Sequence, residues 1–195
     1  MSTWFTRQAN REKLSHRLTN LLNPFFIFTA LCVLVALAQS GPRGLVYVVP
    51  ELLAAGLVAG YVLVMRRRAR VSDFWISARA ERLIPAIVLL AAFAGLQLAL
   101  YLTSAPEALI LTTLSMGLAA ATVAALTLFW KASAHTAVAG HAAVAGVLLL
   151  GVIGSVFILV LPLVVWARVM PGAHTLSQTL VGAGVGAAFA LVFLA

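Results

Sequence analysis

The stretch Arg168-Val-Met-Pro-Gly-Ala-His174-Thr-Leu-Ser-Gln178 is a polar segment between two apolar runs. Ionisable groups at the edge of a bilayer are energetically costly, and they usually face a polar cavity where they serve a function. Pro171 and Gly172 end the incoming helix, which places His174 at or near the N-terminus of the next helix. His174 and Gln178 then lie one helical turn apart, where the Gln178 side-chain oxygen can accept a hydrogen bond from the imidazole.

The composition of the whole chain is that of an integral membrane protein. The 195 residues, one domain by size, are 63% hydrophobic and 9% charged, whereas soluble domains are ~25% charged. The mean hydropathy of +1.08 leads to the same conclusion. We therefore expect an all-α, polytopic transmembrane helix bundle that forms a single domain over residues 1–195.

The formal charge of +8 is attributed to the membrane, because basic residues beside apolar spans mark the cytoplasmic face and contact anionic headgroups. Cys32 is the single cysteine, so the chain offers no partner for an intrachain disulfide. No Cys/His cluster has the spacing of a zinc site. We expect membrane lipids as partners, no nucleic acid, no metal and no other cofactor, and the sequence leaves the oligomeric state open.

The apolar runs predict six or seven spans. Residues 1–23 are polar and basic with a partial apolar stripe, which predicts a short interfacial amphipathic helix, with a frayed cytoplasmic tail as the alternative. Residues 136–168 are expected to form a hairpin of two arms of ~16 residues, each rising ~24 Å, slightly less than the hydrocarbon core. The other spans are expected at about 24–38, 46 or 50 to 65, 85–102, 107–130 and 175–194. Six spans remain if one run is re-entrant or two merge.

The basic residues predict the orientation. In the seven-span arrangement, twelve of the thirteen Lys and Arg residues fall on the side of the N-terminus, and Arg43 alone lies opposite. Because positive charge marks the cytoplasmic side, the N-terminus and the active-site face are expected in the cytoplasm, and the C-terminus outside. The expected location is a bacterial inner (plasma) membrane. Glu51 is expected at the interface, and Gly56-x3-Gly60 and Gly182-x3-Gly186 predict close helix packing.

Two motifs resemble signatures of the type 2 phosphatidic acid phosphatase superfamily, which includes lipid phosphate phosphatases and vanadium haloperoxidases. Ala167-Arg168-x5-His174-x3-Gln178 resembles the third signature, Ser-Arg-x5-His-x3-Asp, with the spacing intact and the serine and aspartate replaced. Ala132-Ser133-Ala134-His135, preceded by Lys131, resembles the second signature, Pro-Ser-Gly-His. The first signature, Lys-x6-Arg-Pro, is matched poorly by the segment 73–85, which carries Arg79 and Arg82 in a different register. The resemblance covers about 73–186, with the catalytic signature region at 131–186.

The resemblance implies metal-independent hydrolysis of a lipid phosphate, such as phosphatidate or a polyprenyl phosphate, through a phosphohistidine. His174 would attack phosphorus, and His135 would protonate the leaving alkoxide and then activate water. The implied ligands of the phosphate oxygens are Arg168, Arg82 or Arg79, Lys131 and Ser133, the last of which also suits a helix N-cap. Two histidines, two helix N-termini and several cations on one face predict an anion site even without the resemblance.

Gln178 replaces the family aspartate that holds the nucleophilic imidazole in the reactive tautomer. An amide preserves geometry but supplies no charge, and such a replacement can lower turnover by orders of magnitude. A non-catalytic lipid-phosphate-binding protein or flippase on the same fold is therefore the alternative. A small-solute channel has little support, since the polar residues cluster at one face.

Overall fold

The computed structural model describes residues 2–76 and 78–195, apart from the side chains of residues 2–9 and 79. The described residues form helices joined by turns, without a strand among them. In chain order the elements are α1 (Ser2–Leu21), α2 (Pro24–Ser40), the 3-10 helix η1 (Gly41–Val48), α3 (Val49–Arg67), the 3-10 helix η2 (Arg79–Glu81), α4 (Leu83–Leu102), α5 (Glu107–Leu126), α6 (Ala134–Leu150), α7 (Val156–Val169) and α8 (Leu176–Leu194). The all-helical prediction is confirmed for this part of the chain.

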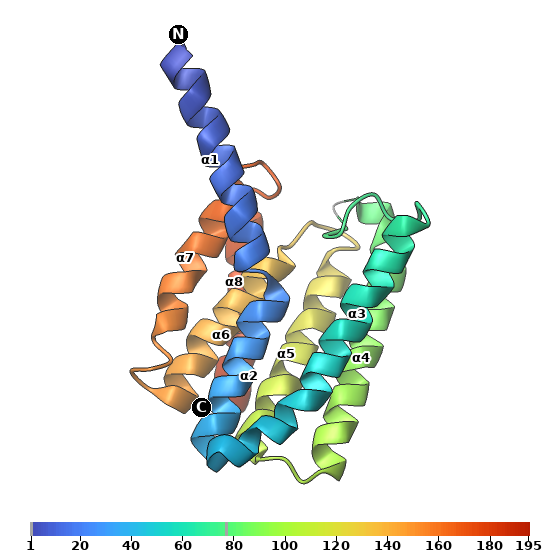
Figure 1. Cartoon of the computed structure of the whole chain (residues 1–195), viewed down its shortest axis with the longest axis vertical. Helices are drawn as coiled ribbons and strands as arrows, with labels where there is room; N and C mark the ends of the chain where they lie inside the picture. The colour runs from blue at the N-terminus through green and yellow to red at the C-terminus, as the bar shows by residue number, and fades with distance from the viewer. Residues whose placement is uncertain (1, 77) are drawn as a thin grey trace.

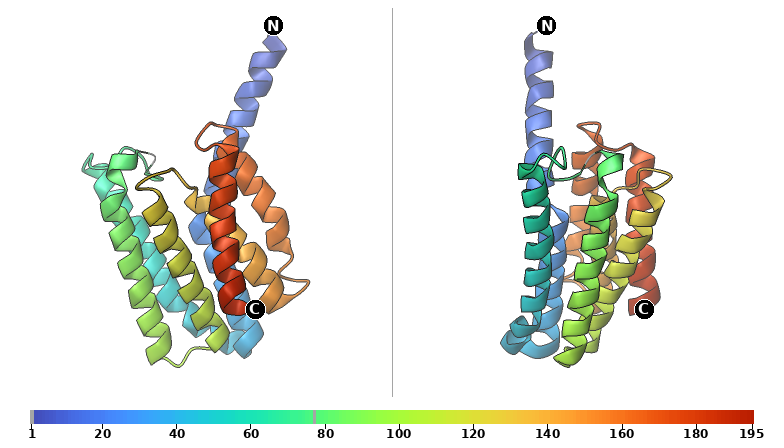
Figure 2. Two further views of the ribbon diagram at one scale, coloured as in Figure 1. Left: turned by 180° about the vertical axis from the view of Figure 1, so that it is seen from behind. Right: turned by 90° about the vertical axis from the view of Figure 1, so that its right-hand side faces the viewer.

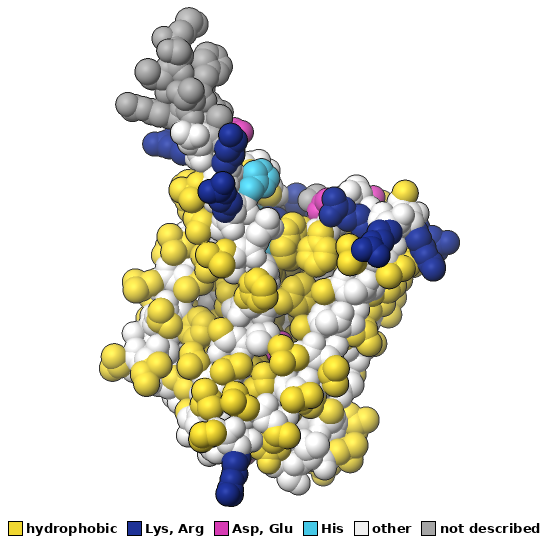
Figure 3. Space-filling view, in the orientation of Figure 1, with side chains coloured by type: hydrophobic (Ala, Val, Ile, Leu, Met, Phe, Trp, Pro, Cys, Tyr) yellow, Lys and Arg dark blue, Asp and Glu magenta, His cyan; other side chains and the backbone are white. Residues whose placement is uncertain are grey.

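The helices α2 to α8 run alternately in opposite directions (Figures 1 and 2). The connections 68–82, 127–133 and 170–175 lie at the end of the bundle that bears α1, which we call the N-terminal end. The connection η1, the other two turns and the C-terminus lie at the opposite end. Lys and Arg side chains gather at the N-terminal end, while the flanks of the bundle are largely apolar (Figure 3).

Four helical stretches are long and apolar enough to cross a membrane: 24–67, which includes η1, and the helices α4, α5 and α8. The helices α6 and α7 are apolar but shorter, with 17 and 14 residues. They rise about 25 Å and 21 Å. Together they form the hairpin predicted for residues 136–168, and both of its open ends lie at the N-terminal end of the bundle.

The prediction that Glu51 lies at the interface is wrong. The Glu51 side chain is only 4% exposed, and its two carboxylate oxygens accept hydrogen bonds from Thr29 Oγ1 at 2.9 and 3.0 Å. The reason is η1, whose eight residues rise about 16 Å along α2 before α3 begins. This rise carries Glu51 back to the level of Thr29, in the second turn of α2, instead of leaving it at the end of the bundle.

The N-terminal segment forms a helix, but its apolar stripe is not what packs. Leu14 and Leu21 are 50% and 64% exposed, whereas Ser15 and Thr19 are buried where α1 contacts α7. The Thr19 hydroxyl donates a hydrogen bond to the Ala167 carbonyl oxygen at 3.3 Å. The helix α1 projects beyond the bundle roughly along its long axis (Figure 2), whereas the expected interfacial helix would lie flat against the end of the bundle.

The helices α6 and α8 make the most extensive helix contact in the fold. A Cβ atom added at Gly140 would collide with the Ala183 carbonyl, and one at Gly186 would collide with the Ala137 carbonyl oxygen. A Cβ atom added at Gly182 would likewise collide with the Ser133 carbonyl oxygen. The close-packing prediction for Gly182-x3-Gly186 is therefore confirmed.

The same prediction for Gly56-x3-Gly60 on α3 is wrong. A Cβ atom at either glycine would meet nothing within 4 Å, because this face of α3 points away from its neighbours in the described structure. The Gly-x3-Gly spacing places two small residues on one helix face, but it does not say whether another helix covers that face.

Gly186→Ala is expected to lower the free energy of unfolding by roughly 1–3 kcal/mol, because an added methyl group in a tight backbone contact forces the two helices apart. Gly184→Ala on the same helix is the matched control, since its Cβ meets nothing within 4 Å; its free energy of unfolding should change by less than about 0.5 kcal/mol. Chemical unfolding of both variants in detergent micelles measures the difference. Equal stabilities would contradict the assigned contact.

Candidate functional site

The start of α6 is capped by its own side chain and is fixed against the start of α8 by two hydrogen bonds. Ser133 is the N-cap of α6, and its hydroxyl oxygen accepts from the Thr136 amide at 3.4 Å. The Ser133 amide donates to the Gln178 carbonyl oxygen at 3.2 Å, and the Thr136 hydroxyl donates to the Thr179 carbonyl oxygen at 2.8 Å. The predicted N-cap is confirmed, and His135, in the first turn of α6, is held beside the loop that leads into α8.

The loop between α7 and α8 brings Arg168 and His174 together. The helix α7 ends at Val169, and Gly172 has a φ of 70°, a conformation that glycine adopts without steric cost. The His174 amide then donates to the Arg168 carbonyl oxygen at 3.1 Å. This hydrogen bond closes the loop formed by residues 169–173, so that the two site residues lie close together. His174 directly precedes Thr175, the N-cap of α8, so the predicted position at a helix N-terminus is confirmed.

Gln178 has a capping role in addition to the expected contact with His174. The Thr175 hydroxyl oxygen accepts from the Gln178 amide at 3.3 Å, and Gln178 Oε1 accepts from the Thr175 amide at 3.1 Å. The two residues thus form a capping box. Because α8 begins only at Leu176, His174 lies just outside the helix, so the prediction that both residues share one helix face is wrong, although the expected side-chain hydrogen bond between Gln178 and His174 is present. The capping-box pattern Thr175-x-x-Gln178 was readable in the sequence.

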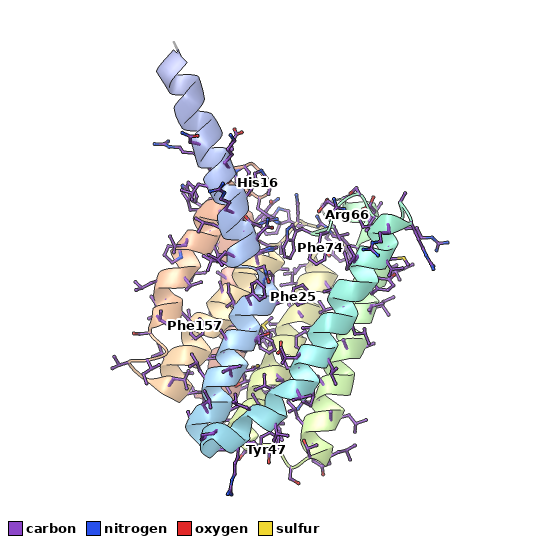
Figure 4. The ribbon with its side chains drawn as sticks, viewed as in Figure 1. His16, Phe25, Tyr47, Arg66, Phe74 and Phe157 are labelled. Atoms are coloured by element: carbon purple, nitrogen blue, oxygen red, sulfur yellow. The ribbon has the colours of Figure 1, made fainter. Side chains whose placement is uncertain are left out.

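A cavity of about 280 Å³ runs from this junction into the bundle. At the N-terminal end it is lined by Arg82, His135, Arg168 and His174, and elsewhere mainly by apolar side chains of α2 to α6. Phe25 on α2 and Phe74 in the loop 68–78 line it near that end (Figure 4). The cavity therefore joins a basic, histidine-bearing end to a long apolar interior.

Three polar atoms at the basic end lack a hydrogen-bond partner among the described residues. They are His135 Nε2, His174 Nδ1 and Arg168 Nε, and all three are buried. Buried polar groups in folded proteins are nearly always hydrogen-bonded, so a cluster of unpartnered atoms at one cavity indicates a ligand. Two imidazoles and a guanidinium are suited to bind an anion with several oxygen atoms.

The charges around His174 keep its imidazole neutral. Burial, together with the nearby charges of Arg168, Lys131 and Arg82, lowers the pKa of His174 to about 4, while a hydrogen bond with the Gln178 side chain acts in the opposite direction. Burial also lowers the pKa of Lys131, with contributions from Arg82 and Arg168 and an opposing one from Asp73. Arg82 thus belongs to the cationic cluster, despite the poor match of the first signature.

The loop 68–78 contributes contacts at the site that sequence reasoning did not assign. The Trp75 ring packs edge-on against His135, with centroids 4.6 Å apart and an interplanar angle of 68°. Asp73 Oδ1 accepts from the Trp75 amide at 2.8 Å, and Arg82 Nε donates to the Ile76 carbonyl oxygen at 3.0 Å. Ile76 has a φ of 50°, which is strained for a β-branched residue. No sequence motif marks this tertiary contact.

The remaining predicted site residues lie beside the cavity or outside the described side chains. Ser133 is fully buried and does not line the cavity, so its prediction as a direct phosphate ligand is not supported; its hydroxyl serves the N-cap. Lys131 Nζ donates to the Ala173 carbonyl oxygen at 2.7 Å and acts on the site through its charge. The Arg79 side chain lies outside the described residues. Among the described residues, no cluster of three His, Cys, Asp or Glu side chains could hold a metal.

The depressed pKa of His174 has a consequence for stability. Between the folded value of about 4 and the unfolded value of about 6.5, the unfolded chain binds a proton that the folded chain does not. The contribution of His174 to stability is therefore fully present above pH ~6.5 and lost as the pH falls toward 4. His174→Gln is expected to flatten this dependence when unfolding is measured from pH 4 to 7. An imidazole that titrates near pH 6.5 by NMR would contradict the assigned environment.

Comparisons with protein-family models, with curated proteins and with solved structures find no match to this chain. The site is consequently characterised by its own geometry. A neutral, half-buried histidine and a buried histidine meet Arg82 and Arg168 at one end of a mainly apolar cavity, with Lys131 beside them.

Proposed function

We propose that the protein is a membrane-embedded lipid phosphate phosphatase that works through a phosphohistidine. One observation carries the proposal: His135, His174, Arg82 and Arg168 line the basic end of a cavity whose other walls are mainly apolar. A lipid phosphate has the matching distribution of charge and hydrocarbon. The substrate class is a phosphomonoester or diphosphate of a lipid, such as phosphatidate or a polyprenyl phosphate.

In the first step, an uncharged ring nitrogen of His174 attacks phosphorus in line, and the bond from phosphorus to the lipid oxygen breaks. His135 takes up a proton in the presence of the bound phosphate and gives it to the leaving alkoxide. In the second step, His135 removes a proton from water, which attacks the phosphohistidine and releases inorganic phosphate. Arg82, Arg168 and Lys131 balance the charge on the non-bridging oxygens throughout.

The proposed placement in the membrane has seven spans, α2 to α8, with the N-terminal end of the bundle in the cytoplasm. Support comes from the antiparallel arrangement of these helices and from the concentration of basic side chains at one end, as the positive-inside tendency requires. The short hairpin of α6 and α7 sinks the site slightly below the cytoplasmic surface. The substrate then comes from the inner leaflet.

The capping box favours one alternative, a non-catalytic lipid-phosphate-binding protein or flippase. Gln178 Oε1 is engaged with the Thr175 amide, and it supplies no charge that could stabilise an imidazolium. The cavity would then bind the same headgroup without a reaction. Hydrolysis is favoured over this alternative because both buried histidines leave a nitrogen unpartnered at the cavity, whereas binding alone requires only the cations.

His174→Ala is expected to abolish phosphate release from lipid phosphates, because the hydroxyls at this helix N-terminus, those of Thr175 and Ser177, do not line the cavity. His16→Ala is the matched control, since His16 lies exposed on α1 outside the cavity (Figure 4); its rate should equal that of the parent. The assay measures phosphate released by purified protein from a lipid panel in the presence of a chelator. Equal rates for the parent and His174→Ala would refute the phosphatase, and binding lost only in Arg168→Ala would then establish the alternative.

The orientation is tested by single cysteines at opposite ends of the bundle, in a background where Cys32 is replaced by serine. Arg67→Cys at the N-terminal end is expected to react with an impermeant thiol reagent only from the cytoplasmic side of sealed vesicles. Arg43→Cys in η1 is expected to react only from the outside, and both positions are exposed. The opposite labelling pattern would reverse the orientation, and same-side labelling would show that α3, which lies between the two positions, does not cross the membrane.

A further inference from the structure

The loop 68–78 places a carboxylate among the cations of the site. Asp73 interacts electrostatically with both Lys131 and Arg168. Its position is fixed locally, because Asp73 Oδ1 accepts from the Trp75 amide at 2.8 Å while the Trp75 ring lies against His135. The mechanism above assigns no step to this carboxylate, and a negative charge beside a phosphate site weakens phosphate binding.

The other carboxylate of this region is engaged differently. Glu81 Oε2 accepts from the amide and the hydroxyl of Ser72, at 2.8 and 3.0 Å. Glu81 is not among the charges that act on Lys131 or Arg168. It closes the loop 72–81 on itself, so Asp73 is the described carboxylate of this loop that belongs to the cationic cluster.

The charges of the described side chains can be added. Arg82, Lys131 and Arg168 contribute three positive charges, Asp73 contributes one negative charge, and 3 − 1 gives +2 for these four described side chains. His174 adds no charge near neutral pH, since its pKa is about 4, and His135 is counted as neutral because it is buried beside cations. A phosphomonoester carries about −1.5 to −2 at pH 7, a diester −1, and a diphosphate more negative charge than a monoester.

We infer that Asp73 sets the net charge of the site so that it selects a phosphomonoester dianion over a diphosphate of the same lipid. This inference rests on the proposed function for the identity of the ligand as a lipid phosphate. Electrostatic complementarity acts mainly on specificity, because a ligand whose charge exceeds that of the site brings uncompensated charge into a poorly solvated place. Without Asp73 the described charges total +3, which matches a diphosphate better.

Asp73→Asn isolates this effect. Asparagine retains the Oδ1 acceptor for the Trp75 amide and has nearly the same shape, so the substitution removes the charge together with the long hydrogen bond from Ser72 Oγ to Oδ2, 3.5 Å. The probes are inorganic phosphate and pyrophosphate, titrated at one fixed ionic strength into purified protein in lipid nanodiscs. A unit charge within 4–6 Å changes the affinity of a site for a charged ligand by about 10- to 1000-fold. The affinity ratio of pyrophosphate to phosphate should therefore rise at least about tenfold.

Glu81→Gln is the matched control, because it removes the same charge from the same loop away from the cluster; the ratio should stay as in the parent. Lys131→Gln is a second variant that does not depend on the folding of Asp73→Asn. It lowers the net charge and should move the ratio at least about threefold in the opposite direction. The inference would be overturned if the affinity ratio of pyrophosphate to phosphate stayed unchanged both in Lys131→Gln and in folded Asp73→Asn. It would also be overturned if Glu81→Gln shifted this ratio as much as Asp73→Asn does.

Hydrolysis provides the second readout. With a lipid monophosphate and a diphosphate of the same tail, Asp73→Asn should shift kcat/KM toward the diphosphate by a similar factor. A parent that releases no phosphate but shows the expected binding ratios would refute the phosphatase and leave the charge selection standing. A parent that hydrolyses both lipids with a preference unaltered in Asp73→Asn would support the phosphatase and refute the charge selection by Asp73.

Discussion

The backbone contact between α6 and α8 is the constraint on which the site depends. Gly140, Gly182 and Gly186 let the two helices approach until carbonyl groups of one face the glycines of the other. The Thr136 hydroxyl then reaches the Thr179 carbonyl oxygen across the contact. Because the two helix starts are locked together, His135 in the first turn of α6 and His174 just before α8 meet at one cavity. A looser packing would separate the histidines before it affected either helix.

The second requirement is electrostatic. Three cations lie near two buried histidines, and water is largely replaced by apolar walls, so the empty site carries positive charge in an environment that solvates it poorly. The loop 68–78 relieves part of this cost by bringing Asp73 into the cluster. The same loop shields His135 with Trp75. Packing of α6 on α8 thus positions the reacting groups, and the loop adjusts their charge and solvent access.

Sequence reasoning was most successful where a local pattern determines the structure. Hydropathy located the helical segments, and Pro171 with Gly172 located the start of α8, because each depends on residues close in the chain. It failed where the structure depends on contacts between residues that are far apart in the chain. The burial of Glu51 depends on the length of η1 along α2. The exposure of Gly56 depends on which face of α3 its neighbours cover. The Trp75 contact with His135 depends on how the loop 68–78 folds over the site. The proposed activity and its site residues stay predictions.

The missing carboxylate at position 178 has a physical counterpart in the cationic cluster. A carboxylate beside a nucleophilic histidine raises the imidazole pKa and stabilises positive charge on the ring. Here burial and the neighbouring cations lower the pKa of His174 to about 4, so the ring rests in its neutral, nucleophilic form without such help. In the proposed mechanism, charge would appear on the ring only when the bond to phosphorus forms, and the attached phosphoryl group would itself be anionic. In such a site the cations that hold the phosphoryl oxygens, rather than a carboxylate on the ring, carry the electrostatic stabilisation of the phosphohistidine.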